Sequence, residues 1–173
     1  MKFYKNKFFL TLSGFQLTWI SCVFGEYCNF PFFGCLIGSI YLIFFFYFQN
    51  DKIKKIKICF IYSLIGYSFD SILSFSQIFV FDSELIVGFL PIWLLFLWPS
   101  FTTLFIDILV FLKKRILLAF LIGAILVPPT YYIGIPLGLA NSNNLFLAMS
   151  IMAFFWGLLM SSYAYYLYKN YIN

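Results

Sequence analysis

The residue of this sequence that is most suited to a chemical role is Asp70, an acid in the middle of a long apolar run. On a helix, residues spaced three and four positions apart share one face. The polar or small residues that share the face of Asp70 are Ser63, Gly66, Tyr67, Ser74 and Gln77. A carboxyl group on such a face can bind a proton or a substrate, or it can join helices by hydrogen bonding. The sequence leaves both interpretations open.

The composition predicts that this helix lies in a membrane. Of the 173 residues, 64% are hydrophobic and 10% are charged, and the mean hydropathy is +0.97. A water-soluble domain usually carries about 25% charged and about 45–50% apolar residues. A chain this short exposes too much of its area to hide so much apolar surface in a core. We therefore expect an all-α polytopic membrane protein.

The apolar stretches predict six transmembrane helices in one bundle. A helix needs about 20 apolar residues to cross a hydrocarbon core of about 30 Å. The stretches that reach this length cover residues 8–25, 30–48, 58–80, 85–112, 116–139 and 145–168. Only short loops join them, so residues 1–173 are predicted to form a single integral membrane domain.

The positive charges predict the orientation of this bundle. With six spans, all of the Lys and Arg residues fall on one side, in the segments 2–7, 52–57 and 113–115 and at Lys169. Positively charged loops remain in the cytoplasm. We therefore expect a multi-pass protein of the bacterial inner (plasma) membrane with both termini in the cytoplasm. The net charge of +5 then needs no nucleic-acid partner, and the expected partner is the lipid bilayer.

Motifs for catalysis and metal binding are missing from the sequence. It contains no histidine, the commonest metal ligand and the usual general base near neutral pH. It has no Cys-x-x-Cys pair, nucleotide-binding glycine loop, zinc-protease motif or Gly-x-Ser-x-Gly. We therefore expect no cofactor, no metal and no catalytic residue. Three of its cysteines, Cys22, Cys28 and Cys35, surround one outer turn, and whether they form a disulfide or only pack stays open.

Several other polar residues are expected to lie at a similar depth in the membrane to Asp70. At 1.5 Å per residue from the cytoplasmic end, Asp70 lies roughly 18 Å deep, just beyond the midplane. Residues of other spans at roughly 12–22 Å are Gln16, Trp98, Thr102, Thr103, Tyr131 and Trp156. The spans contain no Lys or Arg, so Asp70 is expected to have hydroxyl, amide or indole partners, or to stay neutral. Asp107 lies only roughly 9 Å from the inside, where water can reach it, and we favour a packing role there.

Prolines predict irregular backbone in two spans. Pro91 and Pro99 bracket Trp93 in the fourth span, while Pro128-Pro129 and Pro136 interrupt the fifth. Each proline removes a helical hydrogen bond. Broken helices often line transport sites, but they also occur in ordinary helix bundles, and both interpretations stay open.

The order and spacing of several short motifs resemble the bacterial inner-membrane family called domain of unknown function 2878. The motifs are Phe15-Gln16-x-x-Trp19 with Gly25, Gly66 with Asp70-Ser71, Pro91-x-Trp93, Trp98, Thr102-Thr103-Leu104, Pro128 with Tyr131 and Gly134, and Trp156. The resemblance covers nearly the whole chain and implies a small proteobacterial integral membrane protein. Asp107 departs from it, because the family pattern implies a small polar residue there. The resemblance implies no established activity.

Three functions follow as hypotheses. The first is a small transporter, or a membrane-embedded binder of a lipid or small molecule. Its substrate-binding or proton site would comprise Asp70, Ser71, Gln16, Trp93, Trp98, Thr102, Thr103, Tyr131 and Trp156. The alternative is a non-catalytic structural or partner subunit of a membrane complex. A third is an intramembrane lipid-modifying enzyme using Asp70, Ser71 and Tyr131, although we do not expect an enzyme. The ligand and the oligomeric state stay open.

Overall fold

The computed structural model describes residues 2–172, with side chains described for residues 7–169. The chain is mainly helical, as the composition predicts. The helices are α1 (Lys2–Tyr27), α2 (Pro31–Tyr47), α3 (Lys52–Phe75), α4 (Leu94–Asp107), the 3-10 helix η1 (Leu109–Lys114), α5 (Ile116–Leu126), α6 (Pro128–Tyr132) and α7 (Leu145–Ile172). Two-residue strands are β1 (Val80–Phe81), β2 (Ile86–Val87), β3 (Leu90–Pro91) and β4 (Ala140–Asn141). β1 pairs with β4 and β2 with β3, both antiparallel.

The helices differ in their ability to cross a membrane. Three segments are long and apolar enough to do so, namely Lys7–Tyr27, Lys52–Phe75 and Leu145–Lys169. The other apolar helices are shorter and cover Pro31–Tyr47, Leu94–Asp107 and Ile116–Tyr132. Each of the six apolar stretches therefore contains a helix, but only half of these helices have full membrane length.

The span predicted over residues 85–112 is not one continuous helix, and the irregular backbone that its prolines predict is confirmed at Pro91, while Pro99 lies within α4. The first part of this stretch contains β2 and β3, and the helix α4 begins only at Leu94. Gly88 lies at the turn between the two strands with φ +67°, a left-handed conformation that glycine adopts without steric cost. Pro91 lacks the N–H that a helix interior requires. These two residues delay the start of the helix.

The span predicted over residues 116–139 is interrupted at its prolines, as the sequence predicts, and its continuous helix is confined to the first half. α5 ends at Leu126, and Pro128 opens the separate short helix α6, a position that suits proline because the first N–H of a helix has no partner. Turns follow up to β4, with Gly138 at φ +72°. The span predicted over 58–80 is also shifted, since α3 begins at Lys52 and ends at Phe75.

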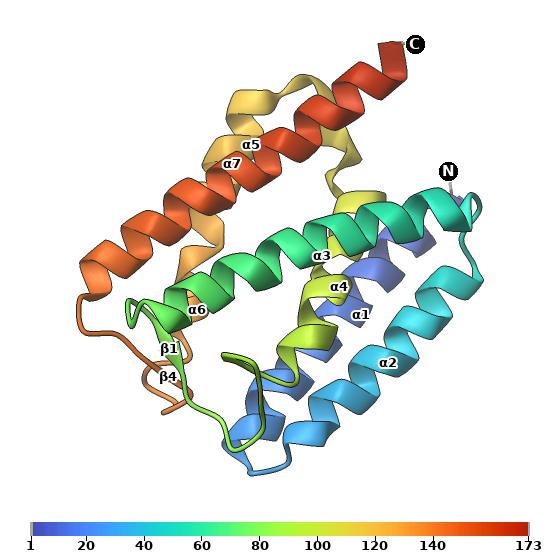
Figure 1. Ribbon diagram of the computed structural model, residues 1–173. Coiled ribbons are helices and arrows are strands. Elements are labelled where there is room, and N and C mark those ends of the chain that lie inside the picture. Colours follow the sequence, from blue (N-terminus) through green and yellow to red (C-terminus); the bar gives the residue numbers. More distant parts are fainter. Residues whose placement is uncertain (1, 173) are drawn as a thin grey trace.

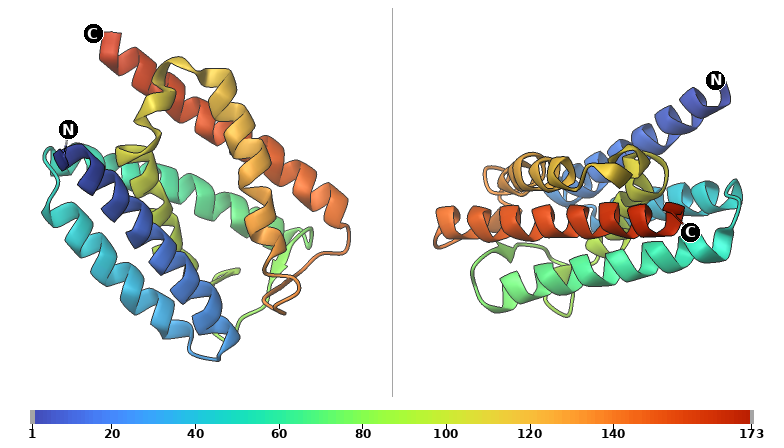
Figure 2. Two further views of the ribbon diagram at one scale, coloured as in Figure 1. Left: turned by 180° about the vertical axis from the view of Figure 1, so that it is seen from behind. Right: turned by 90° about the horizontal axis from the view of Figure 1, so that it is seen from above.

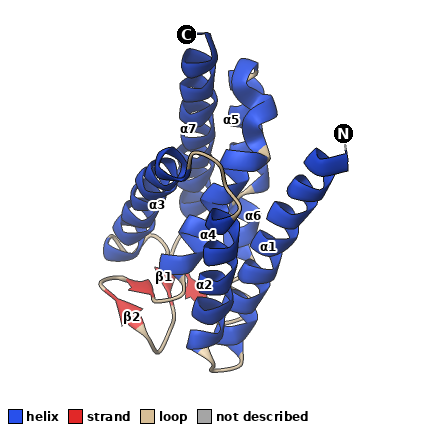
Figure 3. Ribbon diagram, turned by 90° about the vertical axis from the view of Figure 1, so that its right-hand side faces the viewer, coloured by secondary structure: helices blue, strands red, loops and turns tan. Residues whose placement is uncertain are grey.

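The helices are arranged around α4. It packs against α1, α2 and α3, while α5 lies along α7 and α1 lies along α2 (Figure 1). The start of α1, the α2–α3 loop, the η1–α5 connection and the end of α7 lie toward one end of the molecule (Figure 1). The strands lie toward the opposite end, below α3 and beside the lower end of α2 in Figure 3. The basic segments of the sequence thus gather at one end.

Stacked aromatic rings join α7 to α3 and α4. Phe69 of α3 stacks on Phe155 of α7 with ring centroids 3.6 Å apart. The indoles of Trp98 in α4 and Trp156 in α7 are stacked 4.9 Å apart and only 4° from parallel. Flat rings in contact have few rotamers available, so these pairs hold α3, α4 and α7 at a defined separation.

Candidate functional site

The carboxyl group of Asp70 joins three segments of the chain. Asp70 is fully buried in α3. Trp98 Nε1 of α4 donates a hydrogen bond to its Oδ2 at 2.7 Å, and the Tyr131 hydroxyl of α6 donates to its Oδ1 at 3.0 Å. The partners are the indole and hydroxyl groups that the absence of Lys and Arg from the spans predicts. Each oxygen of the acid therefore has a neutral donor.

Trp98 reaches Asp70 because Gly66 leaves room for its ring. Gly66 lies one turn before Asp70 on the same face of α3. A Cβ atom at residue 66 would overlap the six-membered ring of Trp98. The indole of Trp156 is stacked beside that of Trp98. Trp98 is therefore wedged between α3 and α7, with its N–H directed at the acid.

A pocket of about 400 Å³ lies beside Asp70. Its volume falls in the usual range for small-molecule sites, about 300–1,000 Å³. The lining residues come from α1, α3, α4, the end of α5, α6, α7, the strands β1 and β4 and the segments next to them. Most of them are aromatic or aliphatic, so the pocket has mainly apolar walls, and its polar lining residues include Gln16, Asp70, Thr130 and Tyr131.

Six of the nine residues proposed for the site line this pocket. They are Gln16, Asp70, Trp93, Trp98, Tyr131 and Trp156. They come from α1, α3, α4, α6 and α7 and from the residue that precedes α4. Side chains from segments that are distant in the sequence therefore line one pocket.

The other three residues lie away from the pocket. Ser71 Oγ donates to the Tyr67 carbonyl at 2.8 Å. Thr102 and Thr103 are fully buried, and their hydroxyls donate to backbone carbonyls of α4 at 2.7 Å. Depth alone grouped them with Trp98, but Thr103 is rotated about the helix axis by roughly 140° from Trp98. It therefore faces Tyr41 of α2, at 2.6 Å between the two hydroxyl oxygens.

Two tryptophans in the pocket wall have no hydrogen-bond acceptor. Trp93 and Trp156 are 5% and 3% exposed, and their Nε1 atoms are buried. Neither nitrogen forms a hydrogen bond with any part of the chain that the structure describes. A buried donor without a partner costs about 1–3 kcal/mol. Such groups are rare and call for an explanation at each position.

The pocket lies between two pairs of helices. α1 packs on α2 and α4, whereas α5 packs on α7, and α4 lies behind the space between α1 and α5 (Figure 2, left). Gln16 of α1, and Leu126 and Thr130 on the opposite side, line the pocket and are exposed on the molecular surface. The pocket is therefore accessible from the side of the bundle.

Several lining residues were not proposed from the sequence. In α1 these are Phe15, Trp19 and Val23, of which Phe15 and Trp19 belong to the same motif as Gln16. The spacing of four residues between Phe15, Trp19 and Val23 could have indicated a shared face. Phe81 and Ala140, from the β1–β4 pair, close the end of the pocket farthest from the basic segments. No periodicity in the sequence predicts these two.

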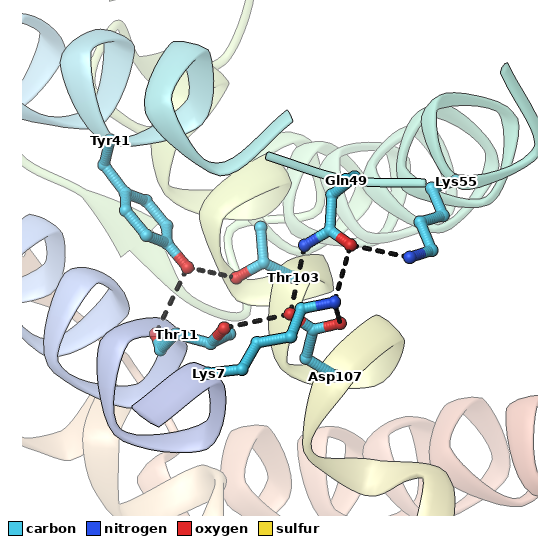
Figure 4. A network of polar contacts seen from close by, with 7 residues as sticks. All are labelled: Lys7, Thr11, Tyr41, Gln49, Lys55, Thr103 and Asp107. Carbon is cyan, nitrogen blue, oxygen red and sulfur yellow. Dashed lines mark hydrogen bonds and ion pairs between the residues drawn. The ribbon is translucent and has the colours of Figure 1, made fainter. Parts of the chain in front are cut away.

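Asp107 forms a second polar cluster at the other end of α4 (Figure 4). Lys7 Nζ lies 3.1 Å from Asp107 Oδ1, and Thr11 and Gln49 each donate to Oδ2 at 3.1 Å. Gln49 Oε1 in turn accepts from Lys7 at 2.8 Å and from Lys55 at 2.6 Å. The cluster ties α1, the α2–α3 loop and α3 to the end of α4. These contacts give Asp107 a role in joining helices.

The structure also describes the cysteines and possible metal ligands. Cys22, Cys28, Cys35 and Cys59 are all free thiols. Among the described residues, no group of three or more Cys, Asp or Glu side chains could hold a metal ion.

Comparison with known proteins identifies a family. The family model described as protein of unknown function, DUF2878, matches residues 9–162. Neither the curated proteins nor the solved structures contain a significant match. The match covers most of the chain and confirms the resemblance seen in the motifs around Gln16, Asp70 and Trp156. The chain therefore belongs to the family known as domain of unknown function 2878.

Proposed function

We propose that this protein binds a lipid or a lipid-soluble small molecule in the pocket beside Asp70, as a small transporter or a membrane-embedded binding protein. The observation that carries the proposal is the pocket of about 400 Å³ beside Asp70, with mainly apolar walls and with exposed lining residues on α1, α5 and α6. A ligand dissolved in the bilayer could reach such a pocket without crossing water. Small-molecule sites commonly combine apolar walls with few polar groups.

We further propose that all six apolar segments cross the bacterial inner membrane, with both termini in the cytoplasm. The gathering of the basic segments at one end supports this orientation. α4 has 14 residues and spans about 21 Å, and β2 and β3 extend its path toward the outer side. Irregular backbone is tolerated at membrane depth where it lines a cavity. Leu139 and Ala140, which follow the turns after α6, do line the pocket.

The charge of the pocket favours an uncharged ligand. Among the described residues that line it, Asp70 is the acid and none is Lys or Arg. An anion would therefore meet no compensating charge in an apolar environment, where an unpaired charge is costly. Both oxygens of Asp70 already accept hydrogen bonds from Trp98 and Tyr131, which leaves the acid poorly placed to attract a cation.

The proposal is tested by identifying what the purified protein carries. The protein would be reconstituted in nanodiscs of bacterial polar lipid and its bound small molecules identified by native mass spectrometry. Val127→Trp places a large ring in the pocket wall and is expected to lower ligand occupancy at least about tenfold, roughly the effect of 1.4 kcal/mol. Leu117→Trp is the control, since Leu117 of α5 is 73% exposed and lies outside the pocket. Equal occupancy in both variants contradicts the proposal.

A second candidate function is a structural or partner subunit of a membrane complex. It is favoured by the hydrogen bonds of Asp70, which join α3, α4 and α6 as helix-linking contacts would. Under this alternative, Asp70→Asn preserves the cellular phenotype of the wild-type gene, because asparagine keeps the shape and an acceptor oxygen. Loss of the phenotype with normal membrane insertion would instead favour the ligand-binding role.

A further inference from the structure

We infer that a groove between α3 and α7, at the basic end of the molecule, binds one anionic phospholipid. The phosphate of the lipid would meet lysines of α3, and its acyl chains would lie along isoleucines of the same helix. This second site is separate from the pocket beside Asp70 and needs no ligand there. It needs only the basic end to face the cytoplasmic leaflet, which is the orientation proposed for the bundle.

The groove has a volume of about 1010 Å³ and lies where α3 and α7 have separated. The rings of Phe69 in α3 and Phe155 in α7 hold the two helices together at 3.6 Å. From this contact the helices diverge toward the basic end (Figure 1). Tyr62 of α3 and Tyr166 of α7 both line the groove and are partly exposed. The groove is therefore accessible from outside the bundle.

Lysines at the start of α3 give the groove a positive charge. Lys52, Lys54 and Lys57 line it, together with the single acid Asp51, and all three lysines are exposed. Lys52 Nζ lies 5.4 Å from the centre of the Tyr47 ring. The side chains of Lys54 and Lys57 have no partner among the residues that the structure describes. Two accessible ammonium groups can therefore bind a phosphate, for which lysine is a common ligand.

Isoleucines continue the same face of α3 beyond the lysines. Ile58, Ile61 and Ile65 line the groove and follow Lys54 at intervals of three or four residues, which keeps them on one face. At 1.5 Å per residue, Ile65 lies about 16 Å from Lys54, which is close to half of a hydrocarbon core of about 30 Å. The groove thus presents charge first and then apolar surface over the depth of one leaflet. A phospholipid has its head group and acyl chains in the same order.

The charge of the groove selects the anionic class of lipid. Anionic lipids of the cytoplasmic leaflet attract Lys and Arg residues that lie near the membrane surface. A zwitterionic lipid would bring its own cation toward Lys54 and Lys57. A soluble anion would leave the isoleucines without an apolar partner. An anionic phospholipid matches both parts of the groove.

The test compares two phospholipids that share their chains and differ in head-group charge. Dioleoylphosphatidylglycerol is anionic, and dioleoylphosphatidylcholine is zwitterionic. Both would be titrated into the delipidated full-length protein in detergent micelles, and the bound lipids counted by native mass spectrometry in ammonium acetate. The first phosphatidylglycerol is expected to bind at least about tenfold more tightly than the first phosphatidylcholine. This preference is expected to fall as the ammonium acetate concentration rises, because salt screens the lysines.

Charge variants locate the site. Lys54→Gln combined with Lys57→Gln removes two positive charges from the groove and is expected to weaken the binding of phosphatidylglycerol at least about tenfold. Lys114→Gln combined with Arg115→Gln is the matched control, because it removes the same charge from exposed residues at the same end, outside the groove. The control is expected to change the affinity by less than about threefold, since exposed charges beyond the groove are screened. Equal losses in both double variants overturn the inference.

Apolar variants test the place of the acyl chains. Ile61→Trp puts a large ring into the groove and is expected to lower the binding of phosphatidylglycerol. Ile56→Trp is the control, because Ile56 lies on another face of α3, outside the groove, and is 48% exposed against 52% for Ile61. Equal binding by the two variants overturns the inference, because the lipid would then bind elsewhere.

The remaining outcomes separate this site from its alternatives. Equal affinity of the wild-type protein for the two phospholipids overturns the inference, even where a variant fails to fold. Glycerol phosphate carries the anionic group without chains, and binding as tight as that of phosphatidylglycerol would show a site for soluble anions instead. A protein that binds phosphatidylglycerol in the groove but carries no ligand beside Asp70 supports the inference and contradicts the proposed function.

Discussion

The indole of Trp98 donates a hydrogen bond of 2.7 Å to Asp70, and the two residues come from different helices of the bundle. This bond links α4, the helix on which α1, α2 and α3 pack, to the face of α3 that carries the acid. It also fixes the ring that stacks on Trp156 in the pocket wall. Stability of the bundle and shape of the pocket therefore depend on the same contact.

Trp98→Phe is expected to destabilise the protein by about 1–3 kcal/mol, because it leaves one buried oxygen of Asp70 without its donor. Unfolding in mixed micelles with increasing sodium dodecyl sulfate measures the change. Tyr168→Phe on the exposed side of α7 is the control and is expected to lie within about 0.5 kcal/mol of wild type. If the loss arises from this bond, Trp98→Phe costs clearly less in an Asp70→Leu background, and an undiminished cost would contradict the assignment.

Gly66→Ala is expected to destabilise by about 1–3 kcal/mol, because the added methyl group overlaps the wedged ring of Trp98. The sign of the change in stability is informative, because at an open site in a helix alanine is more stable than glycine by about 1 kcal/mol. The same unfolding assay measures it, and the indole resonance of Trp98 should shift. Ser68→Ala, at an exposed position two residues later, provides the matched control. A stabilising effect at residue 66 would mean that the ring is free to move.

The Lys7–Asp107 ion pair is expected to show a coupling energy of about 1 kcal/mol in a double-mutant cycle of Lys7→Met and Asp107→Asn. The pair links α1 to the end of α4, and Asp107 is only 5% exposed. Lys54→Met controls for the loss of one positive charge at an exposed site. A coupling energy near zero would show that Thr11 and Gln49 hold the acid without Lys7.

The six-span orientation is tested by labelling single cysteines in a variant without its native cysteines. Asn143→Cys, in the turn before α7, is expected to react with a membrane-impermeant maleimide in intact spheroplasts. Asn50→Cys, in the α2–α3 loop, is expected to react only after the membrane is opened, because the positive segments hold that end inside. Both residues are exposed, so accessibility of the side chain does not differ between them. Reaction of both in intact spheroplasts would contradict the orientation.

The sequence by itself determined the helical character, the family and the face of Asp70, and it indicated association with a membrane. Composition alone favoured association with a membrane, because so many apolar residues are difficult to bury in a chain of this length. The period of the helix predicted that Gly66 and Asp70 share a face, and the absence of cations from the spans predicted neutral partners for the acid. These are local properties, which a single chain segment carries.

Only the tertiary structure decided which of the polar residues meet. Depth is one coordinate, and it cannot distinguish Trp98, which faces Asp70, from Thr103, which faces α2. The free indoles of Trp93 and Trp156 also appear only after folding, because a donor is unpaired only when the surrounding chain buries it without an acceptor. Rotation about each helix axis and packing between distant segments are set by the whole bundle, and so the pocket is a property of the fold.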